Sequence, residues 1–183
     1  MLYLGVDLGG TNIKAALVDE NGAILRESAA PTNLPRSAES VCDDIAALCN
    51  ELAQGQTVAG IGVGCPGMVD GGLVRYSNNL AWENFAMADY LQARTGLPVV
   101  LANDANAAAL GESVAGCAKG AQSAVILTLG TGVGGGVVLD GRLLTGQQVV
   151  MQYVHNLAVG VFLPANSGIY ALCGSYEALI TTV

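Results

Sequence analysis

The residues from Asp7 to Thr11 carry the chemistry of an anion-binding site. A short apolar run ends at Asp7, and Gly9, Gly10 and the hydroxyl of Thr11 follow at once. Glycines leave backbone amides uncovered, and amides that converge from a turn form a concavity that binds anions. A carboxylate beside them can hold Mg²⁺ through water. The pattern predicts a turn that binds nucleotide phosphates, although a glycine pair between strands is also ordinary turn chemistry.

The same pattern returns between residues 124 and 139. The sequence there again runs strand, glycine-rich turn with a threonine, strand, and an acidic turn follows at 140–142. One such hairpin is a weak signal. Two in one chain indicate a duplicated fold whose halves hold one nucleotide between them.

Asn103 and Asp104 form the third group with reactive potential. They follow the apolar run 98–102 and precede an alanine-rich helical pattern. An Asp at a helix start is commonly an N-cap and nothing more. A carboxylate between two phosphate hairpins can instead accept the proton of a hydroxyl that attacks a γ-phosphate.

The elements that must position these residues read as an α/β fold. Strands buried on both faces of a sheet appear as unbroken apolar runs, and several segments have this form. Strands are predicted at 2–7, 12–18, from 23 onward, at 58–64, at 98–102 and twice within 124–139. Ser37 and Ser40 offer caps for a helix with apolar positions 41, 45, 48 and 52, a second helix ends at Gly96, and a third follows Asp104.

Two loops are candidates for a second ligand. Gly64 and Gly67 lie in a rigid loop at the carboxyl end of a strand, which is the edge where α/β sheets bind ligands. Residues 75–85 are read as a loop that combines Trp82 with a polar cluster. An aromatic face with amide side chains suits a sugar, and a loop pinned by a core tryptophan gives the same pattern. Both interpretations stay open.

Composition excludes several classes of partner. The 183 residues carry a net charge of −8 and seven Lys and Arg, too few for the basic footprint that nucleic acid or an anionic membrane requires. Backbone amides and metal must therefore hold any anionic ligand. With 52% apolar and 12% charged residues, the chain has the composition of a buried sheet and enough length for one core, or one core and an incomplete second.

The cysteines and the start of the chain indicate a cytoplasmic protein. Five cysteines, an odd number without a paired CxxC spacing, favour buried free thiols over disulfides or metal. Strand residues follow Met1 directly, so we expect no signal peptide. No apolar run is long and glycine-free enough to span a membrane.

Four segments, taken together, resemble the ROK family of bacterial sugar kinases, especially its glucokinase-like members. They are LGVDLGGTNIK (4–14), GCPGMVD (64–70), NDANAAALGE (103–112) and LTLGTGVGGG (127–136), in family order and spacing. The match covers residues 1 to about 146. It implies the actin, hexokinase and Hsp70 superfamily: a ribonuclease-H-like α/β lobe with a mixed sheet at 1–118, the actin-like ATPase fold, and at 119–183 the opening hairpin of a truncated second lobe.

The resemblance also implies a reaction, the ATP-dependent phosphorylation of a hexose, most often glucose at its 6-hydroxyl. Asp104 then corresponds to the general base and Asn103 to a sugar ligand, with Gly67 and Asn79 as further sugar-side positions. The positions that correspond to the nucleotide-phosphate segments are Asp7, Gly9, Gly10, Thr11, Asn12 and Lys14 in the first hairpin and Gly130, Thr131, Gly132 and Gly134 in the second. ATP and Mg²⁺, the latter reached by Asp7 through water, are the implied cofactors.

After Gly146 the chain departs from the family pattern. His155 lacks the Glu and Gly that would precede the family's zinc histidine, and Cys173 alone cannot make a zinc site, so we expect no zinc. Residues 147–161 are predicted to form an amphipathic helix. An unfinished second lobe exposes a strand edge and apolar surface, which favours a homodimer or other self-association.

Three alternatives to an active kinase stay open. A catalytically inactive family member fits the missing zinc and second-lobe segments. A ROK-type sugar-responsive repressor needs a helix-turn-helix segment ahead of the first strand, and the strand here starts directly after Met1. An actin-like filament or chaperone ATPase is disfavoured by the small size and by the polar segment 75–85.

Overall fold

The structure, a computed structural model, describes residues 1–129, 133–145, 171–172 and 177–181. The chain divides into two compact units, Met1–Asp104 (unit 1) and Ala105–Val183 (unit 2). The division of lobes predicted after residue 118 stays a prediction. From Ala105 onward, helix α3 (Asp104–Val114) packs its alanines against strands of unit 2. Within the described ranges, no helix is long and apolar enough to cross a membrane.

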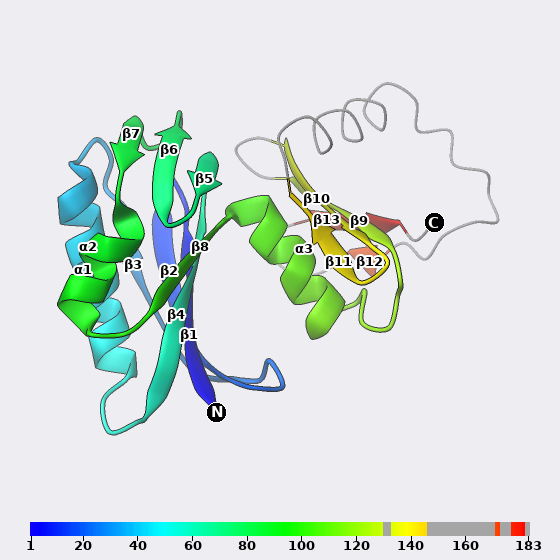
Figure 1. Ribbon diagram of the computed structural model, residues 1–183, viewed down its shortest axis with the longest axis horizontal. Coiled ribbons are helices and arrows are strands. Elements are labelled where there is room, and N and C mark those ends of the chain that lie inside the picture. The colour runs from blue at the N-terminus through cyan, green and yellow to red at the C-terminus, as the bar shows by residue number, and fades with distance from the viewer. Residues whose placement is uncertain (130–132, 146–170, 173–176, 182–183) are drawn as a thin grey trace. The chain divides into compact units, whose positions relative to one another are not determined.

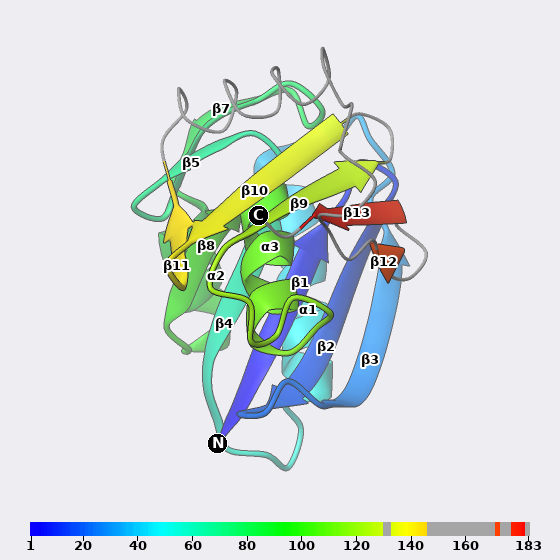
Figure 2. The ribbon, with the colours of Figure 1, turned by 90° about the vertical axis from the view of Figure 1, so that its right-hand side faces the viewer.

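Unit 1 is built on a five-stranded mixed sheet in the order β3-β2-β1-β4-β8 (Figures 1 and 2). The strands are β1 (Leu2–Leu8), β2 (Asn12–Asp19), β3 (Ile24–Pro31), β4 (Val58–Cys65) and β8 (Val99–Asn103). β1 and β3 pair antiparallel with β2, whereas β4 pairs in parallel with both β1 and β8. All five strands predicted for this part of the chain are confirmed.

Alternation along β1 decides which of its side chains reach the core. Leu4, Val6 and Leu8 are buried, whereas Tyr3 and Asp7 are exposed. Successive side chains of a strand point to opposite faces, so Asp7 lies on the face away from the buried leucines. The core therefore anchors the strand that carries this carboxylate without enclosing the carboxylate itself.

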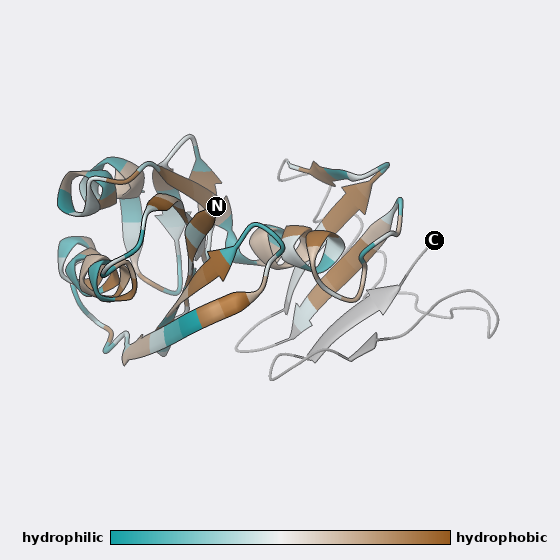
Figure 3. Ribbon diagram, turned by 90° about the horizontal axis from the view of Figure 1, so that it is seen from below, coloured by the Kyte–Doolittle hydropathy of each residue, from teal (hydrophilic) through white to brown (hydrophobic). Residues whose placement is uncertain are grey.

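Helices α1 (Ala38–Leu52) and α2 (Met87–Thr95) pack side by side on one face of this sheet (Figure 1). Ser37 caps α1 as predicted, because its hydroxyl accepts a hydrogen bond from the Ser40 amide (3.2 Å). Gly96 ends α2 in the left-handed conformation. In Figure 3 both helices are striped with hydrophilic and hydrophobic residues, as expected for helices with one buried face.

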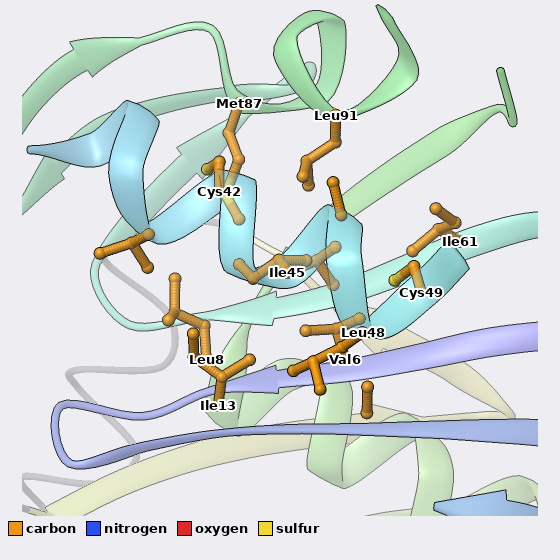
Figure 4. Packing of buried hydrophobic residues seen from close by; sticks show 14 of the residues in the cluster. Val6, Leu8, Ile13, Cys42, Ile45, Leu48, Cys49, Ile61, Met87 and Leu91 are labelled. Atoms are coloured by element: carbon orange, nitrogen blue, oxygen red, sulfur yellow. The ribbon is translucent and has the colours of Figure 1, made fainter. Parts of the chain in front are cut away.

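The buried face of α1 joins the second helix to the sheet (Figure 4). The predicted apolar face of α1 is confirmed: Val41, Ile45, Leu48 and Leu52 are all buried. They belong to one cluster with Val6, Leu8 and Ile13 of the sheet and with Met87 and Leu91 of α2. Each such side chain stabilises the fold by about 1.5–3 kcal/mol on burial. This cluster joins the sheet and both helices into one core.

Residues 68–85 of unit 1 form a separate antiparallel sheet in the order β5-β6-β7. Its strands are β5 (Met68–Asp70), β6 (Leu73–Ser77) and β7 (Trp82–Phe85). The interpretation of 75–85 as a loop was wrong, because these residues are a β-hairpin whose register pairs Ser77 with Trp82. The short strands and the polar turn between them hid the alternation in the sequence.

Unit 2 contains α3 from Ala105 onward and a sheet in the order β11-β10-β9-β13-β12. Its strands are β9 (Ala124–Leu129), β10 (Val133–Leu139), β11 (Arg142–Leu144), β12 (Ala171–Leu172) and β13 (Glu177–Thr181). β9 and β10 are antiparallel, so the second predicted hairpin is confirmed. Ala109, Ala118, Ala124 and Ile126 form the unit's core cluster. The predicted helix at 147–161 lies outside the described residues.

Four cysteines lie in the described part of the chain, and none of the four forms a disulfide there. Cys42, Cys49 and Cys65 are buried, as predicted, but Cys117 is exposed. Burial raises the pKa of Cys42 and Cys65 to about 12 and that of Cys49 to about 11. The fifth, Cys173, lies outside the described residues.

We expect Cys117 to be alkylated long before Cys42, Cys49 and Cys65, because the thiolate is the nucleophile and the buried thiols are both shielded and protonated. Iodoacetamide labelling of the native chain at about pH 8, followed by peptide mass spectrometry, measures each rate. In denaturant the four rates should converge. Native labelling of Cys42 as fast as Cys117 would contradict the packing of α1.

Candidate active site

The carboxyl ends of three strands meet at one edge of the unit 1 sheet. β1, β4 and β8 run parallel, and the register pairs Asp7 with Gly64 and Asn103 with Cys65. In α/β sheets this edge is where ligands bind. Segments that are far apart in the sequence, those around Asp7, Gly67 and Asn103, are thereby brought together within one unit.

Asp7 stands among charged neighbours at this edge. Its cross-strand partner is Lys14, and the Asp104 carboxylate is close enough to act on it electrostatically. Although Asp7 is an exposed residue, the pKa of its carboxyl is raised above the ordinary value. Loss of surrounding water is the largest cause, the Lys14 ammonium opposes it, and the negative charge of Asp104 adds to it. The edge therefore gathers two carboxylates and one ammonium.

The turn after β1 is closed by its own backbone. The Gly9 amide donates to the Asn12 carbonyl (2.9 Å), and a Cβ on Gly9 would lie 2.9 Å from that same oxygen. The Gly9 amide is therefore engaged within the hairpin, and the assignment of Gly9 to the phosphate segment stays a prediction. Gly10 and Thr11 are exposed at the tip, and an added Cβ on Gly10 would meet open space. The tip therefore remains the candidate for contact with phosphate.

Thr32 supports this turn and was not predicted from the sequence. It is fully buried, its hydroxyl donates to the Gly9 carbonyl (2.7 Å), and its amide donates to the Thr11 carbonyl (2.8 Å). Nothing in the surrounding residues marks this role, because the bonded groups lie more than 20 positions away in the chain.

Asn103, the last residue of β8, links the turn after β4 to the start of α3. Its side-chain amide donates to the Gly67 carbonyl (3.0 Å) and to the Asp104 carboxylate (2.9 Å). The amide is thus engaged with two partners, and one of its two bonds restrains the carboxylate of Asp104, the first residue of α3. The carboxylate stays exposed at that position, where the helix dipole also favours a negative charge.

Gly67 must be glycine for this link to form. Its φ is 105°, and a Cβ there would collide with the Tyr76 carbonyl oxygen and come within 2.8 Å of the Ser77 Cα. The turn between β4 and β5 is therefore pressed against β6. Close backbone approach at Gly67 was expected from the sequence, and the partner in that approach is a strand of the same unit.

The aromatic side chain that the 75–85 segment was expected to offer to a sugar is not exposed. Trp82 is buried in the core, with its ring 5.7 Å from that of Phe85 in an edge-on arrangement. The core interpretation of Trp82 is thus the one the structure favours. Asn79 is exposed in the turn between β6 and β7 and remains a candidate sugar-side position.

In unit 2, Gly134 has a packing role. It lies in β10 opposite Thr128, and a Cβ on it would come within 3.0 Å of the Ala105 side chain. Its lack of a side chain lets α3 pack closely on the hairpin. Gly130, Thr131 and Gly132, which the resemblance assigned to the second phosphate segment, lie outside the described residues.

The described residues contain no group of three or more His, Cys, Asp or Glu side chains that could hold a metal ion by themselves. Mg²⁺ does not need one, because it commonly takes one or two carboxylates together with substrate phosphates and retained water. The exposed carboxylate of Asp7 beside the glycine turn fits that requirement. His155 and Cys173, on which the zinc prediction rests, lie outside the described residues.

Comparison with known proteins identifies the family. The ROK family model matches residues 3–178. The glucokinase of Thermotoga maritima is 45% identical over 147 residues, which cover 79% of this chain and 46% of that protein. The glucokinase of Streptomyces coelicolor is 40% identical over 147 residues, with the same two shares. A ROK family glucokinase from Streptomyces griseus, crystallised with glucose and AMPPNP, matches 80% of this chain and 47% of its own at 40% identity and a TM-score of 0.75.

The chain belongs to the ROK family. The resemblance of the four sequence segments is confirmed, and so is the fold class, an actin-like ATPase fold with a mixed α/β sheet. The chain spans about half the length of the known relatives it matches.

Asp7→Asn should raise the free energy of unfolding at neutral pH, because the fold disfavours the ionised form of this carboxyl. A carboxyl whose folded pKa is raised contributes stability below its unfolded pKa and loses it as the pH rises through the folded pKa. The gain should therefore be near zero at low pH, where the carboxyl is protonated in both states, and grow as the pH rises toward neutral. Urea unfolding across this range measures it, with the exposed Glu27→Gln as control. A variant that is less stable at every pH would contradict the unfavourable charge of Asp7 in the fold.

Gly67→Ala should lower the free energy of unfolding by about 1–3 kcal/mol, because the methyl group meets backbone atoms and the φ is unfavourable. Gly5→Ala is the matched control, since Gly5 also lies in unit 1 and its Cβ would meet open space. The control should stay within about 0.5 kcal/mol of the unaltered chain. Equal stability of both variants in urea would rule out the close contact between Gly67 and β6.

Proposed function

We propose that this chain carries the acceptor side of a sugar kinase and that the reaction is ATP-dependent phosphorylation of a hexose, glucose at its 6-hydroxyl. One observation carries the proposal: the Asn103 amide holds the exposed Asp104 carboxylate at the sheet edge, within electrostatic reach of Asp7. The glucokinases of Thermotoga maritima and Streptomyces coelicolor and the glucose-bound structure from Streptomyces griseus support it.

Asp104 is the general base in this proposal. As the sugar 6-oxygen bonds to the γ-phosphorus, its proton passes to a carboxylate oxygen of Asp104. The bond from that phosphorus to the bridging oxygen breaks, and ADP leaves with the electron pair. The 2.9 Å bond from Asn103 restrains the carboxylate for this task, so that less ordering is needed when the sugar arrives.

Asn103 is the sugar ligand in this proposal, and its hydrogen bonds within the protein decide which of its atoms can bind a sugar hydroxyl. Both of its N–H groups donate within the protein, to Gly67 and to Asp104. A sugar hydroxyl that contacts this side chain must therefore donate to the amide oxygen. Gly67 and Asn79 are the other sugar-side positions.

The phosphates of ATP are assigned to the two glycine hairpins. In the first, the candidates are Asp7, Gly10, Thr11, Asn12 and Lys14, with Gly9 as the residue that shapes the turn. In the second they are Gly130, Thr131, Gly132 and Gly134. Bound Mg²⁺ would neutralise phosphate charge, and Asp7 is the residue that would hold it through water. The Lys14 ammonium beside Asp7 adds a further positive charge.

The proposal locates the protein in the cytoplasm, where three buried free thiols fit a reducing environment. A homodimer, the division of lobes at residue 118 and the absence of zinc stay predictions. A relative with a different function, a ROK family transcriptional regulator, is 26% identical with a TM-score of 0.71, and no described residue favours that function over catalysis.

A coupled assay of ADP release over a panel of hexoses tests the proposal on this chain. Asp104→Asn should lower hexose-dependent turnover by about 100-fold or more, because the amide cannot accept the proton. The matched control is Asp89→Asn, an exposed carboxylate of α2. Equal turnover with and without Asp104 would reject it as the base, and an unaltered chain without hexose-dependent turnover would reject kinase activity for this chain.

A further inference from the structure

The β6–β7 hairpin contains two buried polar groups that have no hydrogen-bond partner in the described part of the chain. Ser77 is 0% exposed and Trp82 is 5% exposed. Neither the Ser77 hydroxyl nor the Trp82 indole N–H has a hydrogen-bond partner among the described residues. One such group left unpaired costs about 1–3 kcal/mol, so a pair of them in one hairpin calls for an explanation.

The two groups belong to the same face of the hairpin. Ser77 ends β6 and is the register partner of Trp82, which begins β7. Directly opposed residues share a face, with their Cβ atoms about 4.5–5.5 Å apart. A hydroxyl can donate and accept, whereas an indole N–H only donates. One internal water that accepts from Trp82 and bonds to Ser77 satisfies both, and buried waters of this kind are regular parts of folded proteins.

Ser77 also contacts Gly67, whose carbonyl accepts a hydrogen bond from the residue that holds the candidate base. A Cβ on Gly67 would come within 2.8 Å of the Ser77 Cα and 3.0 Å of its Cβ, so the two residues are in direct contact. The Gly67 carbonyl accepts from the Asn103 amide at 3.0 Å, and that amide donates to Asp104 at 2.9 Å. A contiguous path therefore runs from Ser77 through Gly67 and Asn103 to Asp104.

We propose that Ser77 and Trp82 are positioning residues of the acceptor site, which hold the turn between β4 and β5 through one shared internal water. This turn places the Gly67 carbonyl, which bonds to the Asn103 amide, and that amide bonds to Asp104. The link to sugar binding rests on the proposed function, whereas the path itself lies within unit 1 and can be tested without it. A purely structural Ser77 predicts the opposite behaviour, because its removal would relieve the fold of an unsatisfied hydroxyl.

Nuclear magnetic resonance of Ser77→Ala tests the path directly. Trp82 is the only tryptophan of the chain, so its indole proton gives a single signal. We expect that signal to show cross-relaxation with a bound water in the unaltered chain and to lose it in Ser77→Ala, while the Asn103 side-chain amide signals shift. Ser28→Ala, on edge strand β3, should change neither. Unchanged Asn103 signals together with a raised melting temperature would overturn the proposal.

A glucose titration followed by Trp82 fluorescence tests the consequence for binding. Ser77→Ala should raise the glucose Kd about threefold to tenfold, the loss expected for one hydrogen bond, at nearly unchanged melting temperature. An unchanged Kd would overturn the positioning role. If the unaltered chain binds no glucose, the proposed function fails, and the resonance experiment still decides the positioning role by itself. If Ser77→Ala does not fold, Ser77→Cys, a nearly isosteric and weaker donor, replaces it and should shift the same signals in the same direction.

Discussion

The parallel pairing of β4 with β1 and β8 is the constraint on which the rest of the site depends. Parallel strands deliver their carboxyl ends to one edge, and the register sets Asp7 level with Gly64 and Asn103 level with Cys65. The buried leucines and valines of these strands, held by α1 and α2, keep that edge in place. The stability of this edge therefore comes mainly from buried apolar residues, not from the exposed polar residues that could perform chemistry.

At this edge an unfavourable charge lowers the stability of the fold, whereas a close backbone contact restrains a turn. Two carboxylates and an ammonium lie near one another, and the raised pKa of Asp7 is the sign that the fold tolerates an unfavourable charge there. Sites that bind cations or transfer protons commonly contain carboxylates whose negative charge lowers the stability of the fold. The close contact of Gly67 with β6 has the opposite effect, because it removes freedom from the turn that orients Asn103. The unfavourable charge is thus that of Asp7, and the steric restraint acts at Gly67, which bonds to Asn103.

Much of this could be predicted from local pattern. The first hairpin, the amphipathic face of α1, the Ser37 cap and the Gly96 stop follow from periodicity and capping rules, and each was confirmed. The β6–β7 hairpin was not predicted, because strands of five and four residues around a polar turn leave too little alternation to recognise. Thr32 and Ser77 were missed for a different reason, since their importance lies in contacts with Gly9 and Gly67, which are distant in the chain.

The amino-acid sequence by itself determined the family, the order of the three helices and of strands β1–β4 and β8–β10, and the residue types that could perform chemistry, because motifs and periodicity are local properties of the chain. Only the tertiary structure decided how those residues are used. It engaged the Gly9 amide within its own turn, buried Trp82 in the core and turned the Asn103 amide toward Gly67 and Asp104. The physical reason is that hydrogen bonds and burial depend on which groups the register brings within a few ångströms, and no local pattern specifies that distance.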